Sequence, residues 1–398
     1  MSLCPEYRVR LFLSVDLVGS TAFKSGSDVA ADALYPEWVE SFRQFYQQFP
    51  ETLDSSYRQT KSALSGDDQL INGGPKIWKT IGDEILFCAR IISLRHLSCC
   101  ISSFLTALDN YGRMLENSGV PLDVKGAGWL ASFPAENISI SVQRGGASGK
   151  AGNQDLLSEE FEDEADRFPF RFDFLGKGLD AGFRIAKNAS TDRFTSSAEL
   201  SFLLAQATVQ NMFSGRFTYH GRETFKGVIR NQPYPVVSID TERNPEKRNI
   251  RERERILTRE SEASPLALHD FLLAFMSHEN MEIPVLSMDG GDEGLEPPAS
   301  YQRFKRAWEV GAKENQERDD SITASENAEN EGGEHLSPAI TNFAKQMSSD
   351  ASRLTSRASA EEFNGETIRA APRALSSAQS KASRKKPNGS DDENSAGR

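Results

Sequence analysis

RVRLFLSVDLVGST, residues 8–21, is the stretch that decides the expected fold class of this chain. Its first part, Arg8–Val15, is short, leucine-rich and β-branched, which predicts a buried strand. Asp16 follows at the strand end, and a Gly-Ser-Thr turn then opens a helix. A carboxylate placed there can hold a hard cation, and free backbone N–H groups at a helix start suit a phosphate. Alone, the stretch is equally compatible with a turn aspartate and a simple helix N-cap.

Strands alternate with amphipathic helices from Arg8 to about Thr241, which predicts an α/β or α+β domain. The expected helices cover residues 29–49, 91–115, 179–187 and 198–213. The expected strands cover 122–133, 168–175 and 234–239, with a hairpin over 77–87 that turns at Gly82-Asp83. Phenylalanines alternate with polar residues over 168–175, as in a half-buried strand.

Composition divides the chain into three parts. Residues 1–241 are expected to form one folded domain, interrupted by a polar and then acidic insert at about 145–166, whose acidic end is expected to be a solvated loop. Residues 242–310 are expected to be a charged linker with short helices. Residues 311–398 are poor in aromatic residues and cannot bury enough apolar surface, so a mostly disordered tail is expected.

Charge and cysteine usage exclude several classes of protein. Lys+Arg is 46 and Asp+Glu is 58, a net charge of -12, which argues against a DNA-binding protein. The sequence contains no apolar run of about 18 residues, so no membrane span is expected, and its first residues lack a secretory signal. Four cysteines without metal-type spacing favour a reduced, cytoplasmic protein.

Two further motifs carry charged side chains at turns. In KTIGDE, residues 79–84, a tight hairpin presents Asp83 at its tip and Lys79 on the incoming strand, although a Gly-Asp turn by itself is ordinary. In the third motif, Asp173 lies on a strand, and Asp180 and Arg184 follow on one face of a helix. A plain surface ion pair between Asp180 and Arg184 is the simpler interpretation of that spacing.

In this order and spacing, the three motifs resemble the catalytic domain of the class III nucleotidyl cyclases, the family of adenylate and guanylate cyclases. A Lys-Gly-Val close to the end, Lys226–Val228, is similar to the family's C-terminal pattern. The resemblance spans residues 8–240. It implies a ferredoxin-like α+β fold with a central mixed or antiparallel sheet flanked by helices. Asp180 departs from the pattern, because the family has asparagine there, and the interval between Asp16 and Asp83 is longer than usual.

The resemblance also implies a metal-dependent reaction. Asp16 and Asp83, with the carbonyl of Leu17, would hold two Mn²⁺ or Mg²⁺ ions per site. One ion would lower the pKa of the ribose 3′-hydroxyl and the other would bind the triphosphate. Arg184 would stabilise charge on the phosphate in the transition state, and Asp180 would contact the ribose region.

Substrate contacts follow from the same resemblance. Lys79 and Asp173 would contact the edge of the base. The turn would contact the substrate through Gly19, Ser20 and Thr21. In the family the site forms between two catalytic domains, so a homodimer is implied.

Within the family, the chain looks similar to the pyrimidine cyclases of bacterial antiphage (Pycsar) systems. The insertions, the aspartate at position 180 and the start of the sequence directly at the first strand suggest this subfamily. The expected substrate is UTP or CTP, and a separate cyclic-nucleotide effector would respond to the product. Lys79 with Asp173, the pair expected of an adenylate cyclase, leaves ATP open.

Three other functions stay open. A non-catalytic nucleotide-binding module is disfavoured because Asp16, Asp83, Lys79 and Arg184 are all present. A diguanylate cyclase, suggested by the sequence IGDE at residues 81–84, would leave the third motif without a role. The last possibility is that the C-terminal third is an interaction tail, and the sequence does not show whether it contacts RNA, a membrane or a partner protein.

Overall fold

The computed structural model of the chain describes residues 3–26, 34–64, 73–142, 157–258, 262–288 and 296–331. The chain divides into two units, Met1–Arg318 and Asp319–Arg398. Most of the expected insert and the tail beyond Glu331 lie outside the described residues.

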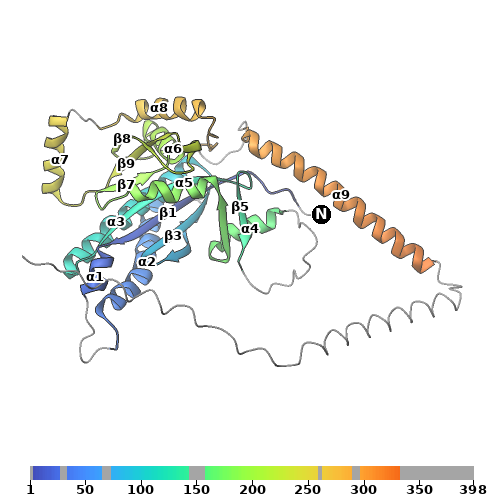
Figure 1. Cartoon of the computed structure of the whole chain (residues 1–398), viewed down its shortest axis with the longest axis horizontal. Coiled ribbons are helices and arrows are strands. Elements are labelled where there is room, and N and C mark those ends of the chain that lie inside the picture. Colours follow the sequence, from blue (N-terminus) through green and yellow to red (C-terminus); the bar gives the residue numbers. More distant parts are fainter. Residues whose placement is uncertain are drawn as a thin grey trace, which may run out of the picture. The chain divides into compact units, whose positions relative to one another are not determined.

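A seven-stranded sheet organises the first unit, and several of its strands are labelled in Figure 1. The strand order is β2-β3-β1-β4-β7-β9-β8. Its strands are β1 (Arg8–Val18), β2 (Lys76–Ile81), β3 (Glu84–Ile91), β4 (Asp123–Phe133), β7 (Arg193–Ser196), β8 (Phe217–Thr224) and β9 (Pro233–Asp240). Only β4 and β7 pair in parallel among these strands. A second sheet pairs β5 (Asn137–Ser141) with β6 (Phe172–Gly176). The expected α+β fold with a mixed, mostly antiparallel sheet is confirmed.

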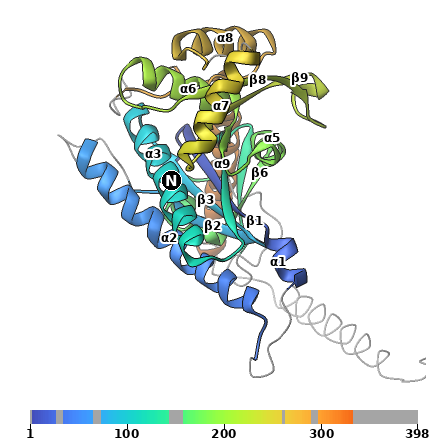
Figure 2. The same ribbon diagram turned by 90° about the vertical axis from the view of Figure 1, so that its left-hand side faces the viewer.

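Helices α2 and α3 pack side by side against this sheet (Figure 2). The described helices are α1 (Ser20–Gly26), α2 (Glu37–Leu64), α3 (Leu94–Ser118), α4 (Glu159–Arg167), α5 (Lys177–Ile185), α6 (Ala198–Val209), α7 (Pro245–Thr258), α8 (Pro265–His278) and α9 (Ala299–Glu331). Ser93 caps α3 by accepting a hydrogen bond from the His96 N–H, and Gly119 ends the helix at a φ of 71°. No helix in the described part of the chain is long and apolar enough to cross a bilayer.

Strand β1 has two buried faces of different chemistry. Its odd-numbered residues, from Val9 to Leu17, are all apolar and pack in the core that contains Phe49 of α2 and Phe104 of α3. The even-numbered face carries Phe12 among the rings of Trp78, Trp129 and Phe174, with charged residues on either side. The sequence therefore predicted a buried strand correctly, and the structure adds that its two arginines, Arg8 and Arg10, are buried as well.

Helix α4 pairs with the arginines of that face. Arg8 and Arg10 have side chains with 0% exposure, and Arg10 lies 2.7 Å from a Glu162 oxygen and 2.6 Å from an Asp166 oxygen. Asp166 also pairs with Arg8 at 2.8 Å. The prediction of a solvated loop over residues 159–166 was wrong, because two buried guanidinium groups require carboxylate partners and α4 supplies them.

Other boundaries also differ from the expectations. The strand expected over 168–175 is shorter, because Pro169–Arg171 form a 3-10 turn before β6 begins. Helix α2 extends to Leu64, well beyond the end of the helix expected over residues 29–49. Strand β8 was not predicted, since its outer positions are polar and exposed.

Replacing Arg10 tests how far the fold depends on the α4 contacts. Arg10→Met should lower the free energy of unfolding by about 3–5 kcal/mol, because it leaves the buried Glu162 without its cation and removes one of the cations paired with Asp166. Urea unfolding followed by circular dichroism measures it. Arg58→Met, which removes an exposed ion pair with Asp54, should change the free energy little. Equal effects of the two substitutions would show that the buried network does not stabilise the fold.

Candidate active site

Asp16 and Asp83 come together at one end of β1. The Leu17 N–H donates to the Asp83 carbonyl at 3.2 Å, so the end of β1 is joined to the β2–β3 turn. The Ser20 hydroxyl, at the first residue of α1, donates to a carboxylate oxygen of Asp83. The turn itself depends on Gly82, whose φ is 63°, and the Tyr46 hydroxyl donates to its carbonyl. The first and second sequence motifs are thus neighbours in space.

Two more charged residues flank Asp16 on adjacent strands. Glu84 is its cross-strand partner on β3, and Lys125 is its partner on β4. The Lys125 Nζ lies 3.1 Å from Asp16 Oδ2, and the Ser14 hydroxyl donates to Glu84. Burial raises the pKa of the Asp16 carboxyl above its ordinary value; the nearby Asp83 also raises it, whereas Lys125 lowers it.

Glu84 responds to the same surroundings. Burial raises the pKa of its carboxyl, and the charges of Asp16 and Asp83 act in the same direction. An added cation would lower the pKa of both carboxyls by stabilising their ionised forms. The charge distribution at this end of β1 therefore favours cation binding.

The oxygen donors here fit a hard divalent cation. Among the described residues, no group of three or more His, Cys, Asp or Glu side chains is arranged to hold a metal. The ligands predicted for a divalent ion are two carboxylates, of Asp16 and Asp83, and the main-chain carbonyl of Leu17. Mg²⁺ and Mn²⁺ accept such incomplete protein sites, because they are commonly held by one or two carboxylates together with substrate phosphates and water.

Lys79 and Asp173 form a second charged pair. The Lys79 Nζ lies 2.8 Å from Asp173 Oδ1, and it also lies 4.0 Å from the centre of the Trp78 ring. Lys79 lies on β2 and Asp173 on β6, so two strands of different sheets supply the pair. Both side chains are about one-third exposed, at 34% and 37%, which leaves them accessible to a ligand.

Helix α5 carries Asp180 and Arg184. Gly182 lets this helix approach β4 closely, since a Cβ at Gly182 would lie 2.2 Å from Cγ of Trp129. Asp180 is exposed, and no ion pair joins Asp180 to Arg184 in the described part of the chain. The surface pair that was the simpler interpretation of their spacing is thus not formed.

Arg184 instead lies against the Lys226–Val228 segment. A Cβ at Gly227 would lie 3.0 Å from Nη1 of Arg184, and Gly227 has a φ of 78°. The side chain of Asn231 fixes this turn by accepting a hydrogen bond of 2.6 Å from the Gly227 N–H. The third motif and the C-terminal pattern, far apart in the sequence, therefore meet at Arg184.

Glu84, Lys125 and Tyr46 were missed by the sequence analysis. Glu84 could have been found, because it directly follows Asp83 in the hairpin motif. Lys125 and Tyr46 could not, because their roles depend on strand register and on a long-range contact. Thr21 is exposed on α1, and its expected substrate contact stays a prediction, as do those of Gly19 and Ser20.

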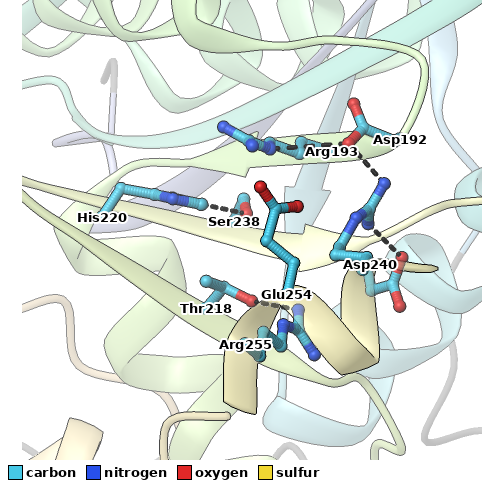
Figure 3. A pocket seen from close by; sticks show the side chains of 9 residues that line it. Asp192, Arg193, Thr218, His220, Ser238, Asp240, Glu254 and Arg255 are labelled. Atoms are coloured by element: carbon cyan, nitrogen blue, oxygen red, sulfur yellow. Dashed lines mark hydrogen bonds and ion pairs between the residues drawn. The ribbon is translucent and has the colours of Figure 1, made fainter. Parts of the chain in front are cut away.

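Two of the cavities among the described residues differ in their relation to the predicted site. The first has a volume of about 650 Å³ and borders the predicted turn at Gly19 and Phe23 of α1. The second, of about 210 Å³, lies between β7, β8, β9 and α7 and contains none of the predicted site residues (Figure 3). Its charged residues largely pair with one another: Arg251, for example, lies 3.1 Å from Asp240.

Adding one methyl group at Gly182 tests how closely α5 packs against β4. Gly182→Ala should lower the free energy of unfolding by about 1–3 kcal/mol, because the new Cβ would overlap the Trp129 ring. Thermal or urea unfolding measures the change. Gly26→Ala is the matched control, since nothing lies within 4 Å of a Cβ there. A Gly182→Ala protein as stable as this control would contradict the close packing that positions Arg184.

No protein-family model matches the chain, and no curated protein matches it. Among solved structures, the chain is similar to the adenylyl cyclase CyaB from P. aeruginosa, with 10% identity, a TM-score of 0.38 and coverage of 59% of this chain and 94% of that chain. It is also similar to the guanylyl cyclase Cya2, with 14% identity, a TM-score of 0.32 and coverage of 60% and 93%. A third is the guanylate cyclase domain of RhGC from Catenaria anguillulae in complex with GTP, with 10% identity, a TM-score of 0.34 and coverage of 59% and 97%. Matches at these levels do not assign an activity to this chain.

Proposed function

We propose that this chain is a nucleotidyl cyclase of the cytoplasm that converts a nucleoside triphosphate into a 3′,5′-cyclic nucleotide and pyrophosphate. The observation that carries the proposal is the juxtaposition of Asp16 and Asp83, joined through the Leu17 N–H and the Ser20 hydroxyl. Two oxygen-donor side chains held at a strand end match the need of phosphoryl chemistry for divalent metal ions.

The metal ions, Mn²⁺ or Mg²⁺, would supply acidification of the ribose 3′-hydroxyl and neutralisation of the triphosphate. Asp16, Asp83 and the Leu17 carbonyl would hold them. Ser20 has a supporting role, because its hydroxyl donates to Asp83 and orients that carboxylate. In the reaction, the ribose 3′-oxygen loses its proton and bonds to the α-phosphorus, while the bond from that phosphorus to the bridging oxygen breaks and pyrophosphate leaves.

The remaining predicted residues would bind and orient the substrate. Lys79 and Asp173 offer a donor and an acceptor side by side, which suits the hydrogen-bonding edge of a base. Arg184 is permanently charged and presents a planar fork of donors toward the charge that develops on the phosphate. Asp180 would contact the ribose, and the turn over Gly19–Thr21 would contact the phosphates.

We propose that the active protein is a homodimer formed over the outer face of β5 and β6. Ile138, Ile140 and Leu175 expose about two-fifths to one-half of their surfaces there, at 43%, 40% and 48%. Ile138 pairs with Leu175 across the strands, and Ile140 pairs with Asp173. An apolar strip that adjoins the Lys79–Asp173 pair would bring this pair, together with Arg184, to the Asp16 and Asp83 of a second copy.

For the base, we propose a pyrimidine, UTP or CTP, with a role in antiphage signalling through a separate effector. The support is the sequence resemblance, including the aspartate at position 180. ATP is the second candidate, and the Lys79–Asp173 pair favours it. The non-catalytic alternative predicts nucleotide binding without turnover.

Product identification tests the activity directly. The purified chain is incubated with Mn²⁺ and separately with ATP, GTP, CTP and UTP, and products are identified by mass. A cyclic UMP or cyclic CMP product is expected, and Asp16→Ala should abolish it because the cation site loses a carboxylate. Cyclic AMP would replace the pyrimidine assignment with an adenylate cyclase. Nucleotide binding without any cyclic product would support the binding module instead.

Complementation tests the shared site. Arg184→Ala alone should lower turnover by about 10²–10³-fold with little change in nucleotide affinity. Mixing and reassociating Asp16→Ala and Arg184→Ala chains should restore one intact site per heterodimer, about a quarter of wild-type activity in a random mixture. Asp16→Ala mixed with Asp83→Ala is the control and should stay inactive, because both defects fall in the same half of the site. Absence of recovery in the first mixture would argue against a site at the interface.

A further inference from the structure

Lys125 occupies a position that the proposed reaction does not explain. It lies on β4 directly opposite Asp16 of β1, and its Nζ is 3.1 Å from Asp16 Oδ2. Both side chains are 29% exposed, so the pair is neither fully solvated nor fully enclosed. This exposure leaves the ammonium room to withdraw from the carboxylate.

The charges around this pair are unbalanced. Asp83 and Glu84 follow one another at the β2–β3 turn, and Glu84 is the cross-strand partner of Asp16 on the side opposite to Lys125. Of the described basic side chains, Lys125 alone forms an ion pair with any of these three carboxylates. Like charges on adjacent strands destabilise a sheet, so the ammonium of Lys125 lowers the repulsion at this end of β1.

We propose that Lys125 is an internal counter-ion that competes with the divalent metal ion for Asp16. When no metal is bound, its ammonium balances the carboxylates. When a metal ion binds, Lys125 must release Asp16 Oδ2, so the ion pair sets the metal affinity of the site. This inference rests on the proposed function, because it assigns Asp16 to the metal.

The proposed competition predicts the direction in which the metal affinity changes when the charge of Lys125 is removed. Removing the ammonium frees Asp16 before metal arrives, so a divalent ion no longer has to break an ion pair. Because partly exposed ion pairs are weak, the gain in metal affinity should be about twofold to fivefold. A purely structural role predicts the opposite, since Asp16 would lose the contact that positions it and metal would bind more weakly.

The experiment measures binding of Mn²⁺ alone, without nucleotide, by the electron paramagnetic resonance signal of the free ion. Lys125→Met and Lys125→Gln both remove the charge, and Lys125→Arg keeps it. Arg113→Met is the matched control, because it removes one positive charge from an exposed pair with Asp109 at 2.9 Å on α3. Asp16→Ala reports whether the observed binding belongs to the proposed site. Circular dichroism melting confirms that each variant folds.

Tighter Mn²⁺ binding is expected in Lys125→Met and Lys125→Gln, near wild-type binding in Lys125→Arg and Arg113→Met, and loss of binding in Asp16→Ala. Unchanged or weaker binding in the two charge-removing variants, with loss in Asp16→Ala, would overturn the counter-ion proposal and leave the metal site intact. Binding that survives Asp16→Ala would overturn the metal site itself, and the counter-ion proposal with it.

Discussion

Every charged side chain on the central strand β1 is paired with an opposite charge from another element. The strand lies between β3 and β4 in the sheet, and its odd-numbered face is covered by the core beneath α2 and α3. On the even-numbered face, Arg8 and Arg10 lie near one end and Asp16 near the other. A charge enclosed there must find a partner or destabilise the fold by several kcal/mol. Helix α4 supplies carboxylates that pair with the arginines at one end, and Lys125 supplies an ammonium group that pairs with Asp16 at the other.

Partial burial and neighbouring charge also give the candidate site at Asp16 its electrostatic character. A strand end that is partly buried raises the energy of a carboxylate, and a second carboxylate nearby raises it further. Both conditions hold at Asp16, where Asp83 is close. The site is therefore poised to accept positive charge, and hydrogen bonds from Ser20 and the Leu17 N–H hold its parts before any ligand arrives. Such pre-organisation is what a metal or phosphate site requires of its scaffold.

Local patterns predicted the parts of this molecule that have a clear hydrophobic pattern or turn signal of their own. The strand over Arg8–Val15, the hairpin at Gly82-Asp83 and the helix that carries Arg184 were all found in this way. Acidic α4 was mistaken for a loop because its partners lie about 150 positions away on β1. Lys125 was missed for a related reason, since only the register of β1 against β4 aligns it with Asp16. The spacing of motifs can thus identify candidate site residues, but it does not identify the residues that balance their charge.

The ion pair between Asp16 and Lys125 also bears on the choice between an enzyme and a passive binding fold. A partly buried ion pair contributes little net stability, and well-packed apolar residues often replace such pairs at no loss. A sheet that only had to fold would gain nothing from an aspartate, a glutamate and a lysine side by side on three strands. Ordinary folding physics thus gives no reason for these charges at one end of β1, whereas cation-dependent chemistry does. The Lys79–Asp173 pair fits the same argument, because it too is partly exposed and lies beside an apolar strip.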